Sequence, residues 1–262
     1  MQIHRFAIID AENAQEEERM KLLIIRHGDP DYERDTLTEK GWREAEYLAE
    51  KLSNMEIHEF YVSPLGRARD TASCTLQKMN RTAQTFQWLR EFDAPIWRPD
   101  VPDQKKICWD WLPADWMAEE RHFSCRNWYE TPALQEGNVK KEYDWVCGNL
   151  DQLLQEHGYV RDGYYYRAER PNEDTLAFFC HFGLGCVLLS HLLNISPMVL
   201  WHNFCAAPSS VTTVVTEERR KGTASFRMLA YGDTSHLYAN GEAPSVSARF
   251  CERFENMQER HD

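Results

Sequence analysis

A short apolar strand that ends in a cation, an imidazole and a glycine constrains this chain more than any other feature. Residues 22–25 are bulky and uncharged, which is typical of a strand buried on both faces of a sheet. Arg26, His27 and Gly28 follow directly. In open α/β sheets, ligands bind at the carboxyl ends of the strands. The three residues therefore belong either to a ligand site or to an ordinary strand end with a solvated arginine and a chance histidine.

A second apolar run repeats this arrangement later in the chain. Residues 175–180 predict another buried strand, which ends in His181 and a turn that contains Gly183. An apolar helix is expected over residues 184–194. A buried structural histidine is the common alternative, but the repeated position at a strand end favours a functional one.

A third motif places an arginine at the start of a helix. Residues 60–62 predict a short strand, and residues 66–80 predict a helix whose first turn contains Arg67. The free N–H groups and the dipole at a helix start favour an anion. Arg67 is therefore either a surface residue or a second cation directed at the ligand of the first strand.

The rest of the chain predicts an α/β fold. Thr38 should cap a helix over residues 39–53, and Gly158 should end another. The other expected elements are a helix over 138–157, an edge strand or hairpin at 164–166, strands at 211–216 and 226–231, a polar loop at 232–236 and a final helix at about 245–258. Alternating buried strands and helices predict a mostly parallel sheet with helices on both faces.

The domain organisation is expected to be simple. We interpret residues 1–19 as an N-terminal extension, with 3–9 as a possible edge strand, and residues 20–262 as a single domain. Residues 92–140 are rich in tryptophan and proline and have poor periodicity. We interpret them as an insertion that folds over the sheet. Its tryptophans would either form a small core or line a lid that gives substrate selectivity.

Composition excludes several function classes. The net charge of −12 argues against non-specific binding to nucleic acid or to anionic membranes. No apolar run approaches the roughly 20 residues that span a bilayer, and the first residues lack a signal-peptide core, so a cytoplasmic protein is expected. The eight cysteines form no Cys-x-x-Cys pair, which disfavours a zinc site or a disulfide framework. An anionic substrate would need a local cluster of arginine and histidine.

Together the motifs resemble the histidine phosphatase superfamily, and more narrowly its phosphoglycerate mutase-like branch. The resemblance covers roughly residues 20–90 and 174–237 and implies a three-layer α/β/α sandwich. It implies that His27 is the nucleophile that becomes phosphohistidine. The residues that would hold the phosphoryl group are Arg26, Arg67 and His181.

The acid/base residue is assigned from the same resemblance. The family carries a glutamate in a Leu-x-Glu context after the second helix, which matches Glu91 here. Asp93 is the second choice and Asp100 the third. The alternative for Glu91 is a solvated charge paired with Arg90. The His-Asp pair of the family's other branch is absent, because Phe182 follows His181.

The chemistry of phosphoryl transfer fits these residue types. The transferring group spreads negative charge over three oxygens, and arginine forks stabilise that charge, so no metal or other cofactor is required. Imidazole attacks through a neutral nitrogen, and the other nitrogen of His27 should donate to a backbone carbonyl. His181 is expected to work best when it is protonated beside the phosphate.

Three functions follow, in order of preference. The first is a metal-independent phosphomonoester hydrolase that acts on a small phosphorylated metabolite. The second is a phosphoglycerate mutase, which is disfavoured because residues 29–35 are acidic and lack the asparagine that mutases of the family carry there. The third is a catalytically silent binding protein on the same fold. The sequence does not specify the oligomeric state or the substrate.

Overall fold

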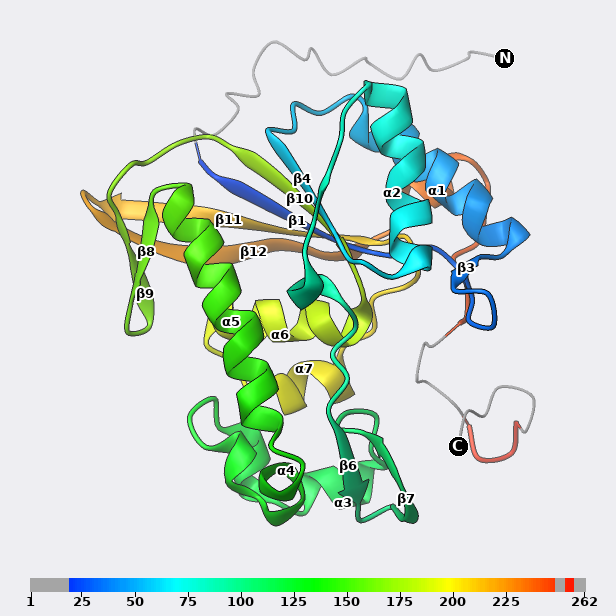
Figure 1. Cartoon of the computed structure of the whole chain (residues 1–262), viewed down its shortest axis with the longest axis vertical. Helices are drawn as coiled ribbons and strands as arrows, with labels where there is room; N and C mark the ends of the chain where they lie inside the picture. Colours follow the sequence, from blue (N-terminus) through cyan, green and yellow to red (C-terminus); the bar gives the residue numbers. More distant parts are fainter. Residues whose placement is uncertain (1–18, 248–252, 257–262) are drawn as a thin grey trace, which may run out of the picture.

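A computed structural model describes residues 19–247 and 253–256. The strand considered for residues 3–9 lies outside the described residues. Figure 1 shows a central sheet with helices above and below it. Within the described residues, no helix combines the length and the apolar character needed to cross a bilayer.

Eight strands of the described chain form one mixed sheet. Their bounds are β1 Lys21–Arg26, β4 Glu59–Val62, β5 Gln84–Thr85, β8 Tyr159–Asp162, β9 Tyr165–Ala168, β10 Thr175–Cys180, β11 Val211–Arg220 and β12 Thr223–Asp233. The order across the sheet is β5-β4-β10-β1-β11-β12-β9-β8. Strands β5, β4, β10 and β1 are parallel to one another, and the strands that follow are joined antiparallel.

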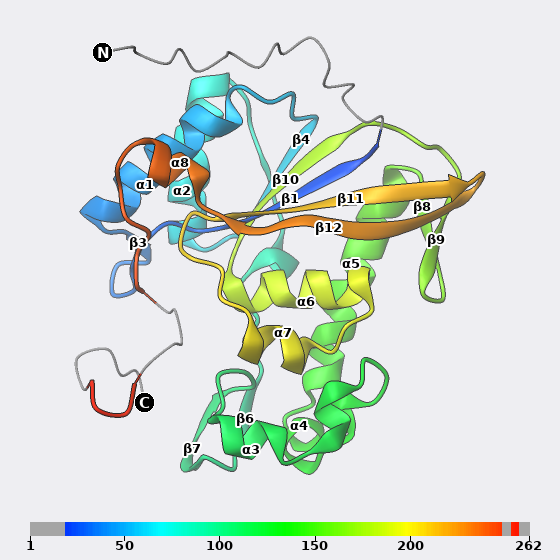
Figure 2. The same cartoon turned by 180° about the vertical axis from the view of Figure 1, so that it is seen from behind.

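Helices cover both faces of this sheet. The α-helices are α1 Glu39–Leu52, α2 Gly66–Met79, α3 Pro113–Met117, α4 Pro132–Glu136, α5 Val139–Glu156, α6 Phe182–Leu193, α7 Pro197–Asn203 and α8 Ser235–Ala239. Helices α1 and α2 lie on one face, and α5 and α6 lie on the other (Figures 1 and 2). The predicted three-layer α/β/α fold is therefore confirmed, with the hairpin β11–β12 and the hairpin β8–β9 extending the parallel part.

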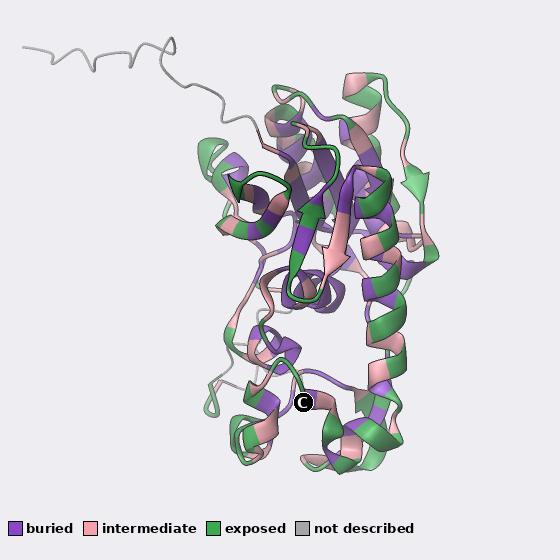
Figure 3. Cartoon of the chain, turned by 90° about the vertical axis from the view of Figure 1, so that its left-hand side faces the viewer, coloured by how far each residue is buried: buried purple, intermediate pink, exposed green. Residues whose placement is uncertain are grey.

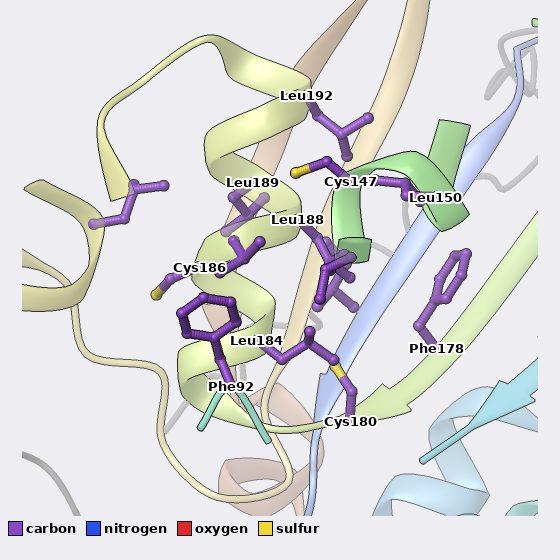
Figure 4. Close-up of a cluster of buried hydrophobic side chains, with 14 of the residues drawn as sticks. Phe92, Cys147, Leu150, Phe178, Cys180, Leu184, Cys186, Leu188, Leu189 and Leu192 are labelled. Carbon is purple, nitrogen blue, oxygen red and sulfur yellow. The ribbon is translucent and has the colours of Figure 1, made fainter. Parts of the chain in front are cut away.

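Strand β1 separates two hydrophobic cores. Leu23 and Ile25 pack toward α1 and α2, whereas Leu22 and Ile24 belong to the core on the side of α6. Buried residues run through the middle of the molecule in Figure 3. Figure 4 shows Leu188 of α6 within the second core. Each such fully buried side chain contributes about 1.5–3 kcal/mol to the free energy of folding, relative to an exposed one.

The pairing of β1 with β10 sets the position of two histidines. Arg26 lies opposite Cys180 in the parallel register. The next residue on each strand is a histidine, and the His27 N–H donates to the Cys180 carbonyl at 3.0 Å. The two predicted strand-end motifs therefore meet at the carboxyl edge of the sheet.

Residues 92–140 lie away from the sheet. They contain the hairpin of β6 Pro95–Arg98 and β7 Val101–Ile107, followed by α3, two short 3-10 helices, η3 Glu120–Phe123 and η4 Trp128–Glu130, and α4. Figures 1 and 2 place them beyond α6 and α7, so the expectation that they fold over the sheet was wrong. Their division from the rest of the chain as an insertion stays a prediction.

Most of the tryptophans of this segment are buried. Trp128 packs against Trp201 of α7 with ring centroids 5.8 Å apart, and Trp116 stacks on His202 at 4.9 Å. Trp97, in contrast, is exposed. These tryptophans thus form a core shared with α7.

The chain after β12 differs from expectation. The predicted loop at 232–236 is wrong, because β12 continues to Asp233 and α8 begins at Ser235, whose N–H is accepted by Asp233 Oδ1 at 2.8 Å. The helix predicted at 245–258 is not present at 245–247 or at 253–256, the parts of it that the structure describes. Ser245 instead donates to Asp29, and Glu242 binds Lys40. These long-range contacts favour an irregular path.

Thr38 caps α1 as predicted, which gives a test of the local fold. Its Oγ1 accepts from the Gly41 N–H at 3.1 Å and donates to Asp29 Oδ2 at 2.6 Å. We expect Thr38→Ala to lower the free energy of unfolding by about 1–2 kcal/mol, measured by urea denaturation. Thr38→Ser keeps the hydroxyl, so its free energy of unfolding should fall much less. An equal loss in both variants would show that the methyl group matters and the cap does not.

Candidate active site

The carboxyl edge of the sheet brings two histidines and an arginine together. The ring centroids of His27 and His181 are 5.1 Å apart, and both side chains are buried. Arg67, in the first turn of α2, donates from Nε to His27 Nε2 at 3.3 Å. Three residues from motifs far apart in the sequence therefore meet, as the sequence predicts.

Arg26 lies beside the two histidines and is fixed by contacts with Ala206 and Phe182. Its NH1 donates to the Ala206 carbonyl at 2.5 Å, and its guanidinium carbon lies 5.6 Å from the centroid of the Phe182 ring. The residue is only 4% exposed. A fixed, permanently charged guanidinium is thus buried next to both imidazoles.

The tautomer of His27 follows from a single contact. Its Nδ1 lies 2.7 Å from the carbonyl oxygen of Gly28, so Nδ1 carries the proton and donates it. Nε2 then has the free lone pair, in agreement with the donation from Arg67 Nε. The sequence predicted this bond to a backbone carbonyl.

The backbone after His27 is fixed as well. The Gly28 N–H donates to Thr71 Oγ1 at 2.9 Å, and the Asp29 N–H donates to Glu44 Oε2 at 2.9 Å. Burial raises the pKa of Glu44 to about 7. Sequence reasoning missed Thr71 and Glu44, because both lie on helix faces that are otherwise typical of ordinary packing.

Burial and the nearby arginines favour the neutral form of both imidazoles. Burial lowers the pKa of His27 well below its usual value, and the charges of Arg26 and Arg67 lower it further. Burial also lowers the pKa of His181, with added contributions from His27 and the two arginines. The expectation that His181 works best when it is protonated beside a phosphate stays a prediction. A bound dianion would work in the opposite direction and favour the charged form.

His181 has one ring nitrogen engaged and one available. Its Nε2 lies 2.7 Å from Ser63 Oγ. Its Nδ1 has no hydrogen-bond partner among the residues that the structure describes. An unsatisfied buried nitrogen is costly, which suits a group that waits for a ligand. Sequence reasoning missed the role of Ser63, because its contact with His181 joins residues 118 positions apart.

Asp35 fixes Arg67 from the side. Its Oδ1 accepts from Arg67 NH1 at 2.6 Å, and its Oδ2 accepts from the Gly66 N–H at 2.6 Å, at the start of α2. The Tyr32 ring lies 5.4 Å from the guanidinium carbon of Arg67. Sequence reasoning read Asp35 only as part of an acidic loop and missed this role.

Glu91 lies against the start of α6. Its Oε1 accepts from the Phe92 N–H at 2.8 Å and from the Leu184 N–H at 2.9 Å. Burial raises the pKa of the carboxyl group, although these bonds and the two arginines oppose the shift. Arg90 pairs with Glu142 at 2.6 Å, so the alternative of a solvated Glu91–Arg90 pair is wrong.

The other two carboxylates considered lie elsewhere. Asp93 is exposed. Asp100 is bound by Arg98 at 2.6 Å and by the Leu112 N–H at 2.8 Å, which commits its carboxylate to the fold of the β6–β7 segment. Of the three candidates, Glu91 is the one joined directly to the helix that follows His181.

The first turn of α6 needs a glycine for this arrangement. A Cβ at Gly183 would lie 2.9 Å from Glu91 Oε1 and 2.7 Å from Trp109 Nε1. Trp109 is itself held by its donation to the Phe92 carbonyl at 3.0 Å. Residues from the segment 92–140 thus reach the site through Trp109.

The assembled groups suit an anion that carries several oxygens. Two guanidinium groups and an unsatisfied imidazole nitrogen can donate to it, and a neutral imidazole with a free lone pair lies beside them. Among residues 19–247 and 253–256, no group of three or more histidine, cysteine or acidic side chains is arranged to hold a metal ion.

Comparisons with known proteins show what this chain is similar to. The sequence profile of the histidine phosphatase superfamily (branch 1) matches residues 22–148. A 2,3-bisphosphoglycerate-dependent phosphoglycerate mutase of Thermoplasma acidophilum is 38% identical over 79 residues, which make up 26% of this chain and 40% of the relative. The chain thus matches less than half the length of that curated relative.

Solved structures share the fold over most of the chain. A phosphoserine phosphatase from Entamoeba histolytica, in complex with 3-phosphoglyceric acid, has a TM-score of 0.54 at 17% identity and covers 83% of this chain and 99% of its own. A mycobacterial glucosyl-3-phosphoglycerate phosphatase has a TM-score of 0.52 at 17% identity and covers 82% and 99%. At such identities the likeness concerns the fold.

The low pKa of His27 can be tested by NMR. We expect its ring signals to stay those of neutral imidazole from about pH 8 to about pH 5.5, where an ordinary histidine of pKa ~6.5 titrates. Arg67→Ala should raise the pKa because it removes a neighbouring cation, whereas Arg67→Lys keeps the charge and should change it less. Loss of the signals in His27→Gln assigns them. An ordinary titration in the unmodified protein would contradict the argument.

Proposed function

Because this chain belongs to the histidine phosphatase superfamily, we propose that it is a phosphomonoester hydrolase that works through a phosphohistidine on His27. The observation that carries the proposal is the pairing of His27 Nδ1 with the Gly28 carbonyl at 2.7 Å. That bond leaves the Nε2 lone pair facing Arg67 and next to His181. A neutral nitrogen beside phosphate-binding cations is what attack on phosphorus needs.

The reaction proceeds in two balanced steps. His27 Nε2 attacks the phosphorus, and the bond from phosphorus to the ester oxygen breaks. Glu91, whose pKa is raised by burial, donates a proton to the leaving oxygen. Water then attacks the phosphohistidine while the Glu91 carboxylate takes a proton from it, which releases phosphate and restores Nε2.

The remaining groups stabilise the charge of the transferring phosphoryl. Arg26 and Arg67 offer guanidinium donors, and His181 offers the ring nitrogen that has no other partner among the described residues. All three are held by protein contacts before substrate arrives. Such preorganised donors need little rearrangement during the reaction.

We further propose a small phosphorylated metabolite as the substrate and the cytoplasm as the location. The named phosphatases among the structural neighbours support a hydrolase with small substrates. Cysteines that remain free thiols, including Cys74 and Cys125, support a reducing compartment.

Phosphoglycerate mutase is the second candidate, supported by the curated relative from Thermoplasma. It is less favoured because Asp35 already neutralises Arg67, which leaves less positive charge for a second anionic group. A catalytically silent binding protein is the alternative from another class.

Hydrolysis of para-nitrophenyl phosphate in the presence of a chelator tests the proposal. We expect turnover in the unmodified protein and a loss of at least about a thousandfold in His27→Ala, as for other nucleophile deletions. His58→Ala is the matched control, since His58 is an exposed histidine outside the site. Activity that persisted in His27→Ala would exclude the nucleophile. Inactivity on a panel of phosphomonoesters would support the binding protein, and transfer between phosphoglycerate positions would support the mutase.

The role of Glu91 predicts a dependence on the leaving group. Glu91→Gln should slow hydrolysis of an alkyl phosphate by about 10²–10⁴, the usual contribution of a positioned acid. The rate of nitrophenyl phosphate hydrolysis should fall much less, because nitrophenolate leaves without a proton. Asp93→Asn is the control and should leave the rate of hydrolysis of both substrates unchanged. If Asp93→Asn showed the leaving-group dependence instead, the assignment to Glu91 would be wrong.

A further inference from the structure

A second cavity lies at the other end of α6 from His181. It has a volume of about 360 Å³ and is bordered by α5, the carboxyl end of α6, the turn of the β8–β9 hairpin and the chain around η4. Pockets for small ligands have volumes of about 300–1,000 Å³. None of the residues to which we assign a step of the reaction lines this cavity.

Aromatic rings form much of its wall. Trp128 makes edge contacts with Tyr129 and Tyr143, with centroids 5.7 and 5.2 Å apart. Tyr164 contributes a further ring from the β8–β9 turn and is 54% exposed. The buried Trp128 supports the wall from behind, and the exposed Tyr164 ring presents a flat face on which a planar ligand can stack.

Two of the three cations at the cavity are already engaged. Arg161 donates to the His191 carbonyl at 3.0 Å and to Asn194 Oδ1 at 2.7 Å, which fixes the end of α6. Lys140 binds the Asp144 carboxylate and lies 5.0 Å from the Tyr129 ring centroid. Arg161 therefore shapes the wall and has little capacity left for a ligand, and the charge of Lys140 is balanced by Asp144.

Arg126 is the available cation. Its guanidinium carbon lies 5.4 Å from the centroid of the Tyr164 ring. Within residues 19–247 and 253–256, no carboxylate lies within ion-pairing distance of it. In a chain of net charge −12, an arginine that lines a cavity without a carboxylate partner favours an anion.

Neutral polar groups complete the lining. Tyr143 and Ser190 share a hydrogen bond of 2.9 Å, and the Ser190 hydroxyl donates to the Ile195 carbonyl at 2.6 Å. The Tyr143 hydroxyl therefore donates to Ser190 Oγ, and it is also in hydrogen-bond contact with the Cys147 thiol.

We propose that this cavity is a second ligand site for a planar aromatic anion of the size of a nucleoside monophosphate. The ligand ring would stack on the exposed Tyr164 ring, and the phosphate would take Arg126 away from that ring. The site goes beyond the proposed hydrolysis and does not depend on it.

Cys125 gives a local readout of occupancy. It is an exposed free thiol that lines the cavity. We expect saturating adenosine 5′-monophosphate to slow its alkylation by N-ethylmaleimide at least fivefold, measured on the Cys125 peptide by mass spectrometry. Cys74, a partly exposed thiol on α2, is the internal control and should be unaffected. Adenosine alone and ribose 5-phosphate alone should protect far less, since each lacks one of the two recognised features.

Two arginine variants separate this site from the reaction centre. Arg126→Ala should raise the concentration of nucleotide needed for protection at least tenfold, whereas Arg67→Ala should leave it unchanged. Repeating the labelling in His27→Ala prevents hydrolysis from consuming the probe. Absence of protection at millimolar nucleotide, or protection that Arg67→Ala abolishes and Arg126→Ala does not, would overturn the proposal. Neither result would bear on phosphate ester hydrolysis at His27.

Discussion

The central constraint in this molecule is the burial of two guanidinium groups beside two imidazoles. Arg26 and Arg67 each lower the pKa of both His27 and His181. Burial acts in the same direction, so the pair of rings stays neutral while the arginines carry the charge. The arginines and the imidazole therefore have separate roles. The permanently charged arginines attract an anion, and the uncharged nitrogen of His27 remains able to attack it.

The surrounding protein keeps these groups in place with ordinary backbone atoms. A carbonyl holds Arg26, another carbonyl holds His27, and two N–H groups hold Glu91. Backbone groups in buried elements cannot swing away as side chains can, so the geometry exists before any ligand binds. The free energy for this order comes from the two cores on either side of β1.

Local sequence patterns predicted the parts of the fold that local forces determine. The buried run of β10 and the helix after Thr38 have clear periodicity, and both form where expected. Asp35 could not be assigned in the same way, because its partner Arg67 is 32 residues away and the contact depends on how a loop meets a helix. The path after Asp233 was missed for a related reason. Its side chains are committed to distant partners such as Lys51, and periodicity carries no information about such contacts.

The pairing of β1 with β10 also has a consequence for the order in which the chain folds. Lys21 pairs with Thr175, so the two strands are separated by most of the polypeptide. Closing so long a loop is entropically costly and slows folding. During synthesis, β1 leaves the ribosome long before its parallel partner exists, and its apolar residues must wait unpaired. Chaperones that cover exposed apolar strands would therefore act on this chain mainly before β10 has been made.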